Sequence, residues 1–508
     1  MKIVIIHYHL DSGGVTSVIL NQLAALKNIK NIEKIIVISG REVKQNLKQI
    51  NPCVEVVVNK DFDYYKSVIM SEAKQSNLNT KYNSIKTCLK NLIDDNTIVH
   101  AHNVNIGKNP ILSVVIRELA DENVKILNHI HDFAEDNRYN NYNLMKQIIE
   151  NEFKLDLNNV MYPCLPNYSY AVLNTRDKKV LTKIGIKKQN MFLLSNTIQG
   201  ETVVVSDERK ADVKQKLKLK DELPIILYPV RAIRRKNIGE FILLSILFKN
   251  KANFIISLAP ESEVEEAAYN KWVDFCENNN INILFNVGKY IKDFEALVAV
   301  SSKVVSTSAA EGFGLFFIEP WKMGTSVAGR EIAGITSDFI DAGIKFNLLY
   351  EKLDIPVNVF SNIEEIIIEY KNYLSQIYLE YGLEVPLDME DSIRKIKIKD
   401  SRIDFVDLSA DFQRIVIEKI LKDDNLKNEI IKLNPFLDEL LKEDSKEFIE
   451  YNQEIIKEKY SNSKYSKNLL EIYEVLLKGI SCECDEYQNG SVLQNFINIK
   501  YLRLIQKS

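Results

Sequence analysis

Residues 2–26 read KIVIIHYHLDSGGVTSVILNQLAAL, and this stretch indicates an α/β fold. Lys2–His7 holds a continuous apolar run, as expected for a parallel strand that helices cover on both faces. Ser12-Gly13-Gly14 is a turn, and an apolar helix is predicted over Val15–Leu26. A strand, a glycine turn and a helix in this order are typical of a doubly wound sheet. We therefore expect a Rossmann-like domain here.

Apolar runs of strand length recur along the chain, and they predict two such domains. In the first we expect further strands at Lys34–Ser39, Val54–Val58, Thr97–His102, Val124–His129, Ala171–Asn174 and Met191–Leu194. In the second we expect strands at Ile225–Val230, Phe254–Leu258, Ile283–Val287 and Val304–Ser306, and helices at Gly239–Phe248 and Glu319–Met323. In such a pair of domains, the carboxyl ends of both sheets face a ligand cleft.

Near residue 346 the composition changes, because the sequence becomes rich in Ile, Leu, Lys, Asp and Glu. We predict a Rossmann-like domain at 1–205, a second at 206–345, a mostly helical insertion at 346–445 and C-terminal helices at 446–508. We expect these last helices to pack back on the first domain.

The composition of the 508 residues is that of a soluble globular protein, with 46% hydrophobic and 27% charged residues. The net charge of −4 does not favour nucleic-acid binding. Residues 1–200 hold 25 Lys+Arg against 19 Asp+Glu, whereas residues 201–508 hold 41 against 51. No run is apolar enough to span a membrane, and no signal-peptide cleavage region is evident. The six cysteines are scattered, which favours reduced thiols and a cytoplasmic location.

All six histidines lie within the first 131 residues, at or just beyond the carboxyl ends of predicted strands. Their two-residue spacing places both members of a pair on one side of a strand. With a strand order of 3-2-1-4-5 the three strands are neighbours, so the histidines should gather at one edge of the sheet. The pairs are His7/His9, His100/His102 and His129/His131.

Three interpretations of the histidines remain open. They could be core residues bonded to the backbone, or they could recognise sugar hydroxyls, because a neutral imidazole both donates and accepts. A zinc site is the least favoured, since no carboxylate ligands with suitable spacing accompany them. We therefore predict no metal.

Residues 311–319 read EGFGLFFIE and follow a predicted strand and a loop of small residues. Their glycines let backbone amides approach an anionic group where a helix begins. Glu311 lies in the loop and Glu319 on the helix, so one carboxylate can meet a sugar while the other meets a ribose. The alternative is a glycine turn with two solvated glutamates.

Residues 230–237 read VRAIRRKN and place four cations at the carboxyl end of a predicted strand. These cations suit a pyrophosphate, although a solvated basic turn has the same composition. Gly13-Gly14 is a second anion-binding corner, at a helix N-terminus. Gly312 and Gly314 lack the third glycine of a dinucleotide fingerprint, which disfavours a dehydrogenase.

In order and spacing, these motifs resemble those of the retaining glycosyltransferases of the GT-B fold, family 4 in particular. Gly13-Gly14-Val15 is similar to the family's N-terminal glycine loop, and Arg231 and Lys236 to its phosphate-binding pair. Glu311 and Glu319 are similar to its E-x7-E element. The likeness covers about 1–345 and 450–480 and includes His100-Ala101-His102, His129-Ile130-His131-Asp132, Asn196, Gly324 and Ile472-Tyr473-Glu474.

This resemblance implies a hexosyl transfer from a UDP- or GDP-linked sugar that retains the anomeric configuration and needs neither a metal nor a cofactor. The catalytic residues would be Glu311, Arg231, Lys236 and His131. Arg231 and Lys236 would neutralise the departing diphosphate, whereas Glu311 and His131 would contact the sugar. Glu319 would hold the ribose. Further donor contacts would come from Gly13, Gly14, Gly288, Tyr290, Phe313, Gly314 and Leu315.

The acceptor would lie on the first domain, near His102, Asp132, Glu135 and Arg138. We expect a hydroxyl of a small molecule or a glycan, and the positive balance of residues 1–200 favours an acidic or phosphorylated one. No strongly basic amphipathic helix supports docking on a membrane. The alternatives are a phosphorylase or an epimerase of the same fold, a non-catalytic sugar-nucleotide-binding subunit of a glycosylation complex, and a partner-recruiting role for 346–445.

Overall fold

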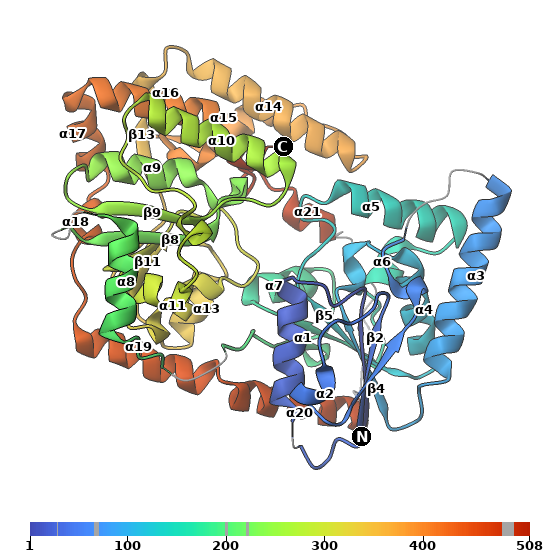
Figure 1. The fold of residues 1–508 in the computed structure, drawn as a ribbon. Coiled ribbons are helices and arrows are strands. Elements are labelled where there is room, and N and C mark those ends of the chain that lie inside the picture. Colours follow the sequence, from blue (N-terminus) through green and yellow to red (C-terminus); the bar gives the residue numbers. More distant parts are fainter. Residues whose placement is uncertain (28, 66–70, 199–201, 220–222, 480–491, 508) are drawn as a thin grey trace. The chain divides into compact units, whose positions relative to one another are not determined.

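The computed structural model describes residues 1–27, 29–65, 71–198, 202–219, 223–479 and 492–507, and the chain in it forms two compact units (Figure 1). The first unit comprises Met1–Gln199 and Tyr460–Ile497, and the second comprises Gly200–Lys459 and Asn498–Ser508. Each unit has its own parallel sheet, so the α/β class with two Rossmann-like sheets is confirmed. The finer division into four parts stays a prediction.

Within its described residues, the first unit contains a seven-stranded parallel sheet of order β3-β2-β1-β4-β5-β6-β7. Most strand residues are buried, as expected where helices cover both faces of a sheet. The strands are β1 (Lys2–His7), β2 (Lys34–Ser39), β3 (Val54–Val58), β4 (Thr97–His102), β5 (Lys125–Ile130), β6 (Tyr168–Val172) and β7 (Met191–Leu193).

Two hydrophobic clusters cover the two faces of this sheet. On one face lie α1 (Gly14–Ala25), α2 (Leu47–Ile50) and α20 (Asn462–Lys478), whose Leu469 and Tyr473 join the same cluster as Ile19 and Leu23 of α1. On the other face lie α3 (Ser71–Lys90), α4 (Pro110–Asp121), α6 (Leu157–Met161) and α7 (Thr175–Lys183). The remaining elements are α5 (Tyr139–Lys146), α21 (Val492–Phe496), the π-helix η3 (Gln147–Glu152) and the 3-10 turns η1 (Lys60–Phe62), η2 (Val104–Ile106) and η4 (Lys188–Asn190).

The second unit contains a parallel sheet of order β12-β11-β10-β8-β9. Its strands are β8 (Ile225–Arg231), β9 (Asn253–Leu258), β10 (Lys303–Ser306), β11 (Ser326–Arg330) and β12 (Leu349–Tyr350). Its helices are α8 (Asp207–Leu217), α9 (Ile238–Leu247), α10 (Glu263–Asn278), α11 (Phe294–Ala299), α12 (Glu319–Lys322) and α13 (Thr336–Asp341), with the 3-10 turns η5 (Arg234–Lys236), η6 (Val287–Lys289) and η7 (Leu315–Phe317).

The strand predicted at Ile283–Val287 is wrong. Among these residues only Leu284 pairs with the sheet, through an isolated bridge to Ile255. Asn286 has a left-handed backbone conformation, with φ of 54°, and η6 begins directly after it. A residue in that conformation ends an extended run, which an apolar pattern alone does not reveal.

Residues 346–445 are mostly helical, as predicted, but they also form a small antiparallel sheet of order β13-β15-β14. Arg330, at the end of β11, holds this sheet to the Rossmann-like sheet, because its guanidinium donates to Glu240 at 2.6 Å and to Asp404 at 2.9 Å. The elements of this region are β13 (Asp354–Pro356), β14 (Ile398–Lys399), β15 (Arg402–Asp404), α14 (Ile363–Glu380), α15 (Met389–Lys397), α16 (Ala410–Lys422), α17 (Asp424–Leu433), α18 (Leu437–Leu440), η8 (Val357–Val359) and η9 (Phe405–Asp407). The second unit also contains α19 (Lys446–Lys459) and η10 (Leu504–Gln506).

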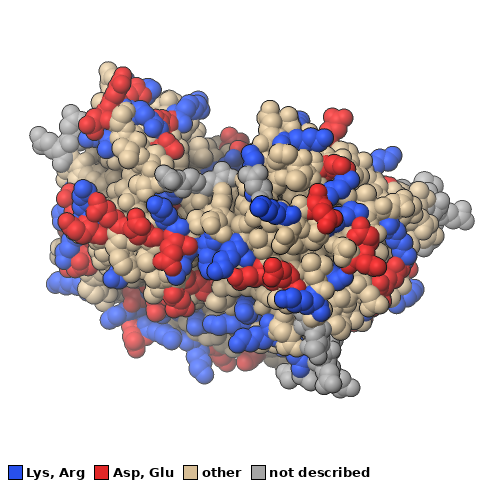
Figure 2. Space-filling model, turned by 90° about the horizontal axis from the view of Figure 1, so that it is seen from below, with Lys and Arg blue, Asp and Glu red and all other residues tan. Residues whose placement is uncertain are grey.

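Charged side chains of both signs are interspersed over the face of the molecule shown in Figure 2. None of the described helices is long and apolar enough to cross a membrane. Cys53, Cys88 and Cys276 are free thiols, whereas Cys164 is disulfide-bonded, so the expectation that all thiols are reduced is wrong for this residue. Scattered spacing cannot reveal which thiols a fold brings together. The remaining two cysteines, at positions 482 and 484, lie outside the described residues.

Candidate functional site

The histidine pairs lie at the carboxyl ends of three neighbouring strands in the first unit. β4 pairs with β1 on one side and with β5 on the other. His100 and His102 lie on β4, His129 lies on β5, and His7 ends β1. Each of these strands also carries an apolar residue two positions earlier that contacts α1 and α20, namely Ile5, Ile98 or Leu127. Because residues two positions apart lie on the same side of a strand, the histidine rings share that face of the sheet.

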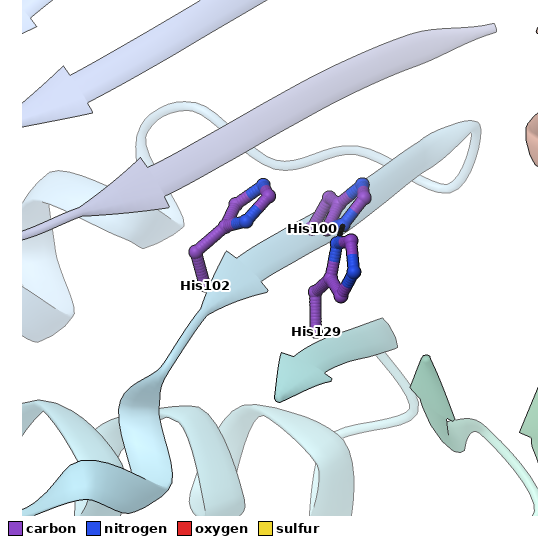
Figure 3. Close-up of side chains that lie close together, drawn as sticks. All are labelled: His100, His102 and His129. Carbon is purple, nitrogen blue, oxygen red and sulfur yellow. Dashed lines mark hydrogen bonds between the residues drawn. The ribbon is translucent and has the colours of Figure 1, made fainter. Parts of the chain in front are cut away.

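The rings lie against one another (Figure 3). His100 and His102 extend from the same strand and His129 from the next one. The rings of His100 and His102 are stacked, with centroids 4.5 Å apart and planes 8° apart. His131, just beyond β5, has its ring centroid 5.2 Å from that of His102 and 4.3 Å from that of His129. The structure therefore brings four rings into one buried cluster.

Two polar side chains from the covering helices anchor this cluster. The amide of Gln22, on α1, lies with Oε1 3.1 Å from Nε2 of His102 and with Nε2 2.9 Å from Nδ1 of His100. The hydroxyl of Tyr473, on α20, lies 2.7 Å from the same Nδ1. Two hydrogen bonds connect the rings themselves, from His100 to His129 at 3.2 Å and between His102 and His131 at 2.9 Å.

The four clustered histidines and His7 are neutral at physiological pH. Burial lowers the pKa of His131 to about 3, and burial together with neighbouring histidines lowers the pKa of His7 and His100 to about 3 each. Burial, followed by the other histidines, lowers the pKa of His102 and His129 well below the usual value. His9 lies outside the cluster of four rings, half-buried, with its ring centroid 5.9 Å from that of His7 and its Nε2 2.9 Å from the hydroxyl of Tyr64.

Three of these histidines could hold a metal ion by proximity. Among the described residues, His100, His102 and His129 each offer a ligand atom, and the three atoms lie within 4.8 Å of one another. Imidazole is a good ligand for zinc. However, Nε2 of His100 already bonds to Nδ1 of His129, and the two nitrogens of His102 bond to Gln22 and His131, so an ion would have to replace some of these hydrogen bonds.

The residues predicted on the acceptor side follow the histidines in the chain. Arg138 donates to the carboxylate of Asp132 at 2.6 Å. Oδ1 of Asn103, in the turn after β4, accepts from the backbone amides of His131 and Asp132, which fixes the start of this loop. Glu135 is buried and accepts from the hydroxyl of Tyr162 at 3.0 Å. Burial raises the pKa of Glu135 to about 7.

Gly13 and Gly14 lie where α1 begins, and Gly13 is its N-cap. A Cβ at Gly14 would meet no described atom within 4 Å, so the backbone here is open to a ligand. Amides at a helix N-terminus attract anions, which agrees with the role that the resemblance implies for this corner.

In the second unit, Lys236 and Glu311 form a salt bridge at the carboxyl edge of the sheet. Both side chains are largely buried, and the guanidinium of Arg235 lies 3.7 Å from the same carboxylate. Burial raises the pKa of Glu311, but Lys236 and Arg235 outweigh it and hold that pKa below its ordinary value. Burial lowers the pKa of Lys236, which Glu311 opposes. The pair therefore consists of an ammonium and a carboxylate.

Arg231 does not join this pair. It lies at the end of β8, exposed, and bonds to Glu261 at 2.7–2.8 Å. Arg234, in the same basic segment, bonds instead to Glu265 at 3.2 Å. Of the four cations predicted to face a pyrophosphate, the structure thus groups Lys236 and Arg235 around Glu311 and turns the other two to separate partners.

The glycine motif after β10 forms a loop that leads into η7 and α12. Gly314 has a φ of 83°, a left-handed conformation that favours glycine. Phe313 is buried against Phe339, whereas Leu315 is exposed. Glu319 is the first residue of α12, and desolvation by the surrounding protein raises its pKa, with Lys322 opposing.

Gly288 and Tyr290, two of the predicted donor contacts, lie at η6, after the end of β9. A Cβ at Gly288 would lie 2.6 Å from Cδ2 of Leu258, so this backbone packs closely against the end of β9. The ring of Tyr290 is exposed. A planar ring on the surface beside a packed loop is suited to stack on a base.

Three residues of these sites were not identified as site residues from the sequence, although the resemblance includes Tyr473. Gln22 is a fully buried polar residue on a mostly apolar helix, and that contrast was the available signal. Tyr473 approaches the histidines from more than 300 residues away. Gln413, on α16, donates to Oδ1 of Asn237 at 2.9 Å, and Asn237 follows Lys236 in a left-handed conformation. No local pattern marks the last two contacts.

One curated protein resembles this chain in sequence, and several solved structures resemble it in fold. The chain is 29% identical over 436 residues to the mannosylglucosyl-3-phosphoglycerate synthase of Petrotoga mobilis, which covers 82% of this chain and 77% of that protein. A glycosyltransferase from Rickettsia africae superposes with a TM-score of 0.54 at 18% identity, over 94% of this chain and 98% of that one. Anabaena Alr3699/HepE in complex with UDP superposes with a TM-score of 0.53 at 13% identity, over 93% and 100%. No family model matches the sequence.

Proposed function

Because this chain has the GT-B fold of glycosyltransferases, we propose that it transfers a hexose from a UDP- or GDP-linked sugar to a hydroxyl of a small-molecule or glycan acceptor. The activity named for the Petrotoga relative supports a transferase. The Anabaena neighbour, bound to UDP, supports a nucleotide-sugar donor.

The buried pair of Lys236 and Glu311 is the observation that carries this proposal. Transfer from a nucleotide sugar requires a cation for the departing diphosphate and a polar group that holds the sugar, and the pair supplies both side by side. Arg231 is available as a second cation, since exposed ion pairs such as the one it makes with Glu261 contribute only about 0–1 kcal/mol and exchange readily.

In the proposed mechanism, the acceptor hydroxyl attacks from the side of the leaving group, so the anomeric configuration is retained. Lys236 and Arg231 stabilise the charge that develops on the diphosphate, and this makes a metal ion unnecessary. Glu319 holds the ribose, Tyr290 stacks on the base, and His131 contacts the donor sugar. These roles follow the family 4 resemblance of the motifs.

For the acceptor we propose an acidic small molecule. The product named for the Petrotoga relative contains a phosphoglycerate group, and residues 1–200 of this chain carry an excess of basic residues. A glucoside of 3-phosphoglycerate is therefore the first acceptor to test, beside neutral sugars.

A thermal-shift panel of UDP- and GDP-sugars tests donor binding, because a donor at 100 times its Kd stabilises the folded protein by about 2.7 kcal/mol. The stabilising donor is then incubated with each acceptor, with and without EDTA. We expect transfer that EDTA does not affect, and a product with the anomeric configuration of the donor by NMR.

The same assay separates the other interpretations. Turnover that requires inorganic phosphate would indicate a phosphorylase, and a product formed without acceptor would indicate an epimerase. A chain that binds a donor and never hydrolyses or transfers it would be a non-catalytic subunit. If no nucleotide sugar stabilises the protein, the proposed function is wrong.

A further inference from the structure

We propose that Gln22 and Tyr473 are positioning residues, which fix the tautomers of four buried histidines so that His131 offers an unprotonated Nδ1 to a sugar hydroxyl. The contact with a sugar rests on the proposed function. The tautomers themselves depend only on hydrogen bonds within the first unit.

The amide of Gln22 sets the pattern, because its nitrogen can only donate and its oxygen can only accept. The oxygen lies 3.1 Å from Nε2 of His102, so this nitrogen carries a proton and donates it. The amide nitrogen lies 2.9 Å from Nδ1 of His100, so this nitrogen is bare and accepts. One buried amide thus imposes the same Nε2–H tautomer on two rings.

The hydroxyl of Tyr473 reinforces the assignment at His100. It lies 2.7 Å from Nδ1, and it can donate a proton that a bare nitrogen accepts. The amide of Gln22 also donates to this hydroxyl at 3.1 Å, which leaves the hydroxyl proton free to point at the imidazole. Two donors from different helices therefore converge on a single acceptor.

The tautomers of His102 and His100 in turn fix those of His131 and His129, because each neutral ring carries one proton. Nδ1 of His102 is bare and lies 2.9 Å from Nε2 of His131, so His131 donates through Nε2 and keeps a bare Nδ1. Nε2 of His100 carries a proton and donates it to Nδ1 of His129 at 3.2 Å. The proton of His129 is then on Nε2, the ring nitrogen that has no partner among the described residues.

Of the four rings, that of His131 comes nearest the surface. His131 is 7% exposed, whereas His100 and His129 are 0% and His102 is 1% exposed. A bare imidazole nitrogen at this edge accepts a hydrogen bond, so the group it recognises must donate one, as a sugar hydroxyl does.

The chain suits a direct test, because it has only six histidines. With 15N in the histidine rings, long-range NMR correlations distinguish the Nε2–H, Nδ1–H and charged forms. At neutral pH we expect His100, His102, His129 and His131 to be neutral Nε2–H tautomers. An Nδ1–H tautomer or an imidazolium at His131 or His102 would overturn the proposal. Zinc chloride is added in a second sample, and zinc-ligated shifts at His100, His102 and His129 would replace the hydrogen-bonded network with a metal site.

Variants of Gln22 test separately its effect on His102 and His131 and its effect on His100 and His129. Gln22→Glu keeps an oxygen for His102 but loses the donor to His100, so the tautomers of His100 and His129 should change while those of His102 and His131 stay. Gln22→Met removes both contacts, so the tautomers of His102 and His131 should change as well. We expect kcat/KM to fall roughly tenfold, as the loss of one hydrogen bond implies. Unchanged tautomers in both variants would refute a positioning role for Gln22.

The matched pair Tyr473→Phe and Tyr465→Phe tests the second donor on α20. Both hydroxyls are buried, but that of Tyr465 has no partner among the described residues. Only Tyr473→Phe should broaden or shift the His100 resonance, and equal effects of the two variants would refute a role for the Tyr473 hydroxyl. If the wild-type protein shows the expected tautomers and transfers no sugar, the proposed function fails while the network stands.

Discussion

Lys236 and Glu311 show that one pair of side chains can serve both the stability and the proposed chemistry of the second unit. Lys236→Met leaves the Glu311 carboxylate buried, with Arg235 at 3.7 Å as the nearest remaining cation. Loss of one partner of a buried pair destabilises a protein by about 3–5 kcal/mol. Transfer should fall by about two orders of magnitude, because one stabilising contact to the leaving group is lost.

A double variant separates these two effects. Lys236→Met combined with Glu311→Gln removes both charges, so urea denaturation should show most of the stability regained, while transfer stays as low as in the single variant. Arg234→Gln is the control, since it removes a cation of the same turn that bonds to Glu265 instead. Full activity in the double variant would contradict a role in transfer.

Glu135 gives the first unit a stability that depends on pH. Its folded pKa of about 7 lies above the ordinary value of 4.5, because burial disfavours the carboxylate. Between these two values the folded state binds more protons than the unfolded state, so the free energy of unfolding falls as the pH rises from 4.5 to 7. The loss is about 3 kcal/mol and is complete above pH 7.

Glu135→Gln should remove this dependence, because a neutral amide can still accept from the hydroxyl of Tyr162. Denaturation in urea at pH 6 and pH 8 measures the effect, and the variant should gain stability relative to the wild type at pH 8. Glu42→Gln, a change of an exposed carboxyl in the same unit, should follow the wild-type curve. If the stability of Glu135→Gln changes between pH 6 and pH 8 by the same amount as that of the wild type, then Glu135 is already ionised at pH 6.

For single residues, the sequence predicts where a side chain lies on its strand better than it predicts which side chain it bonds to. The two-residue spacing places His100 and His102 on one side of a strand, because alternation is a property of the strand itself. Their contacts with Gln22 and Tyr473 depend on how α1 and α20 pack, and no local pattern encodes that. The same holds for Arg231, which the basic segment placed near a pyrophosphate and which bonds to Glu261.

Among the elements, α16 bears most directly on the proposed donor site. Its Gln413 bonds to Asn237, and Nδ2 of Asn237 bonds in turn to Glu240 at 2.9 Å. These bonds hold Asn237 in a left-handed conformation directly after Lys236. Helix α16 therefore stabilises the turn that contains Lys236. This is a structural role for residues 346–445 that does not require a recruited partner.

Gln413→Leu should therefore weaken donor binding while the protein stays folded. We expect the KM for the donor to rise about three- to tenfold, with a smaller change in kcat, because the cation is displaced and not removed. Initial rates at varied donor concentration measure both constants. Glu418→Gln, on the same helix, is the control and should behave as the wild type, whereas an unchanged KM in Gln413→Leu would show that the turn is held without α16.

The elements themselves were largely predictable where the hydrophobic pattern was long. Six strands of the first unit lie within one residue of the predicted ranges, whereas β6 shares only Ala171 and Val172 with the range predicted at Ala171–Asn174. The likeness to GT-B glycosyltransferases is confirmed for the fold. The three strands of the small antiparallel sheet have only two or three residues each, too few for alternation to be visible. The predicted strand at Ile283–Val287 fails for a different reason, since its buried residues Ile283 and Val287 do not join the ladder and only Leu284 forms a bridge to it.

For the molecule as a whole, the two units differ in the chemistry of their cores. Every histidine belongs to the first unit, and the clustered ones are neutral. Both tryptophans, Trp272 and Trp321, belong to the second unit, where the buried polar groups include the ion pairs of Arg330 and Lys236. Acid should therefore act on the two units at different pH values, and the tryptophans report on one of them alone.

The first unit should unfold at a higher pH than the second. Five histidines have folded pKa values far below the ordinary 6.5, so below pH 6.5 the unfolded state binds more protons and the free energy of unfolding falls as the pH falls. At pH 5.5 each histidine that stays neutral in the folded state lowers the free energy of unfolding by about 1 kcal/mol, so together they remove several kcal/mol, a large part of the stability of a typical domain. An acid titration should therefore show a loss of far-UV circular dichroism near pH 5–5.5 before tryptophan fluorescence changes.

His9→Asn should leave this transition in place, because His9 lies outside the cluster and is half-buried. Coincident transitions of the two signals would mean that the units unfold together and that the histidines do not set the acid limit.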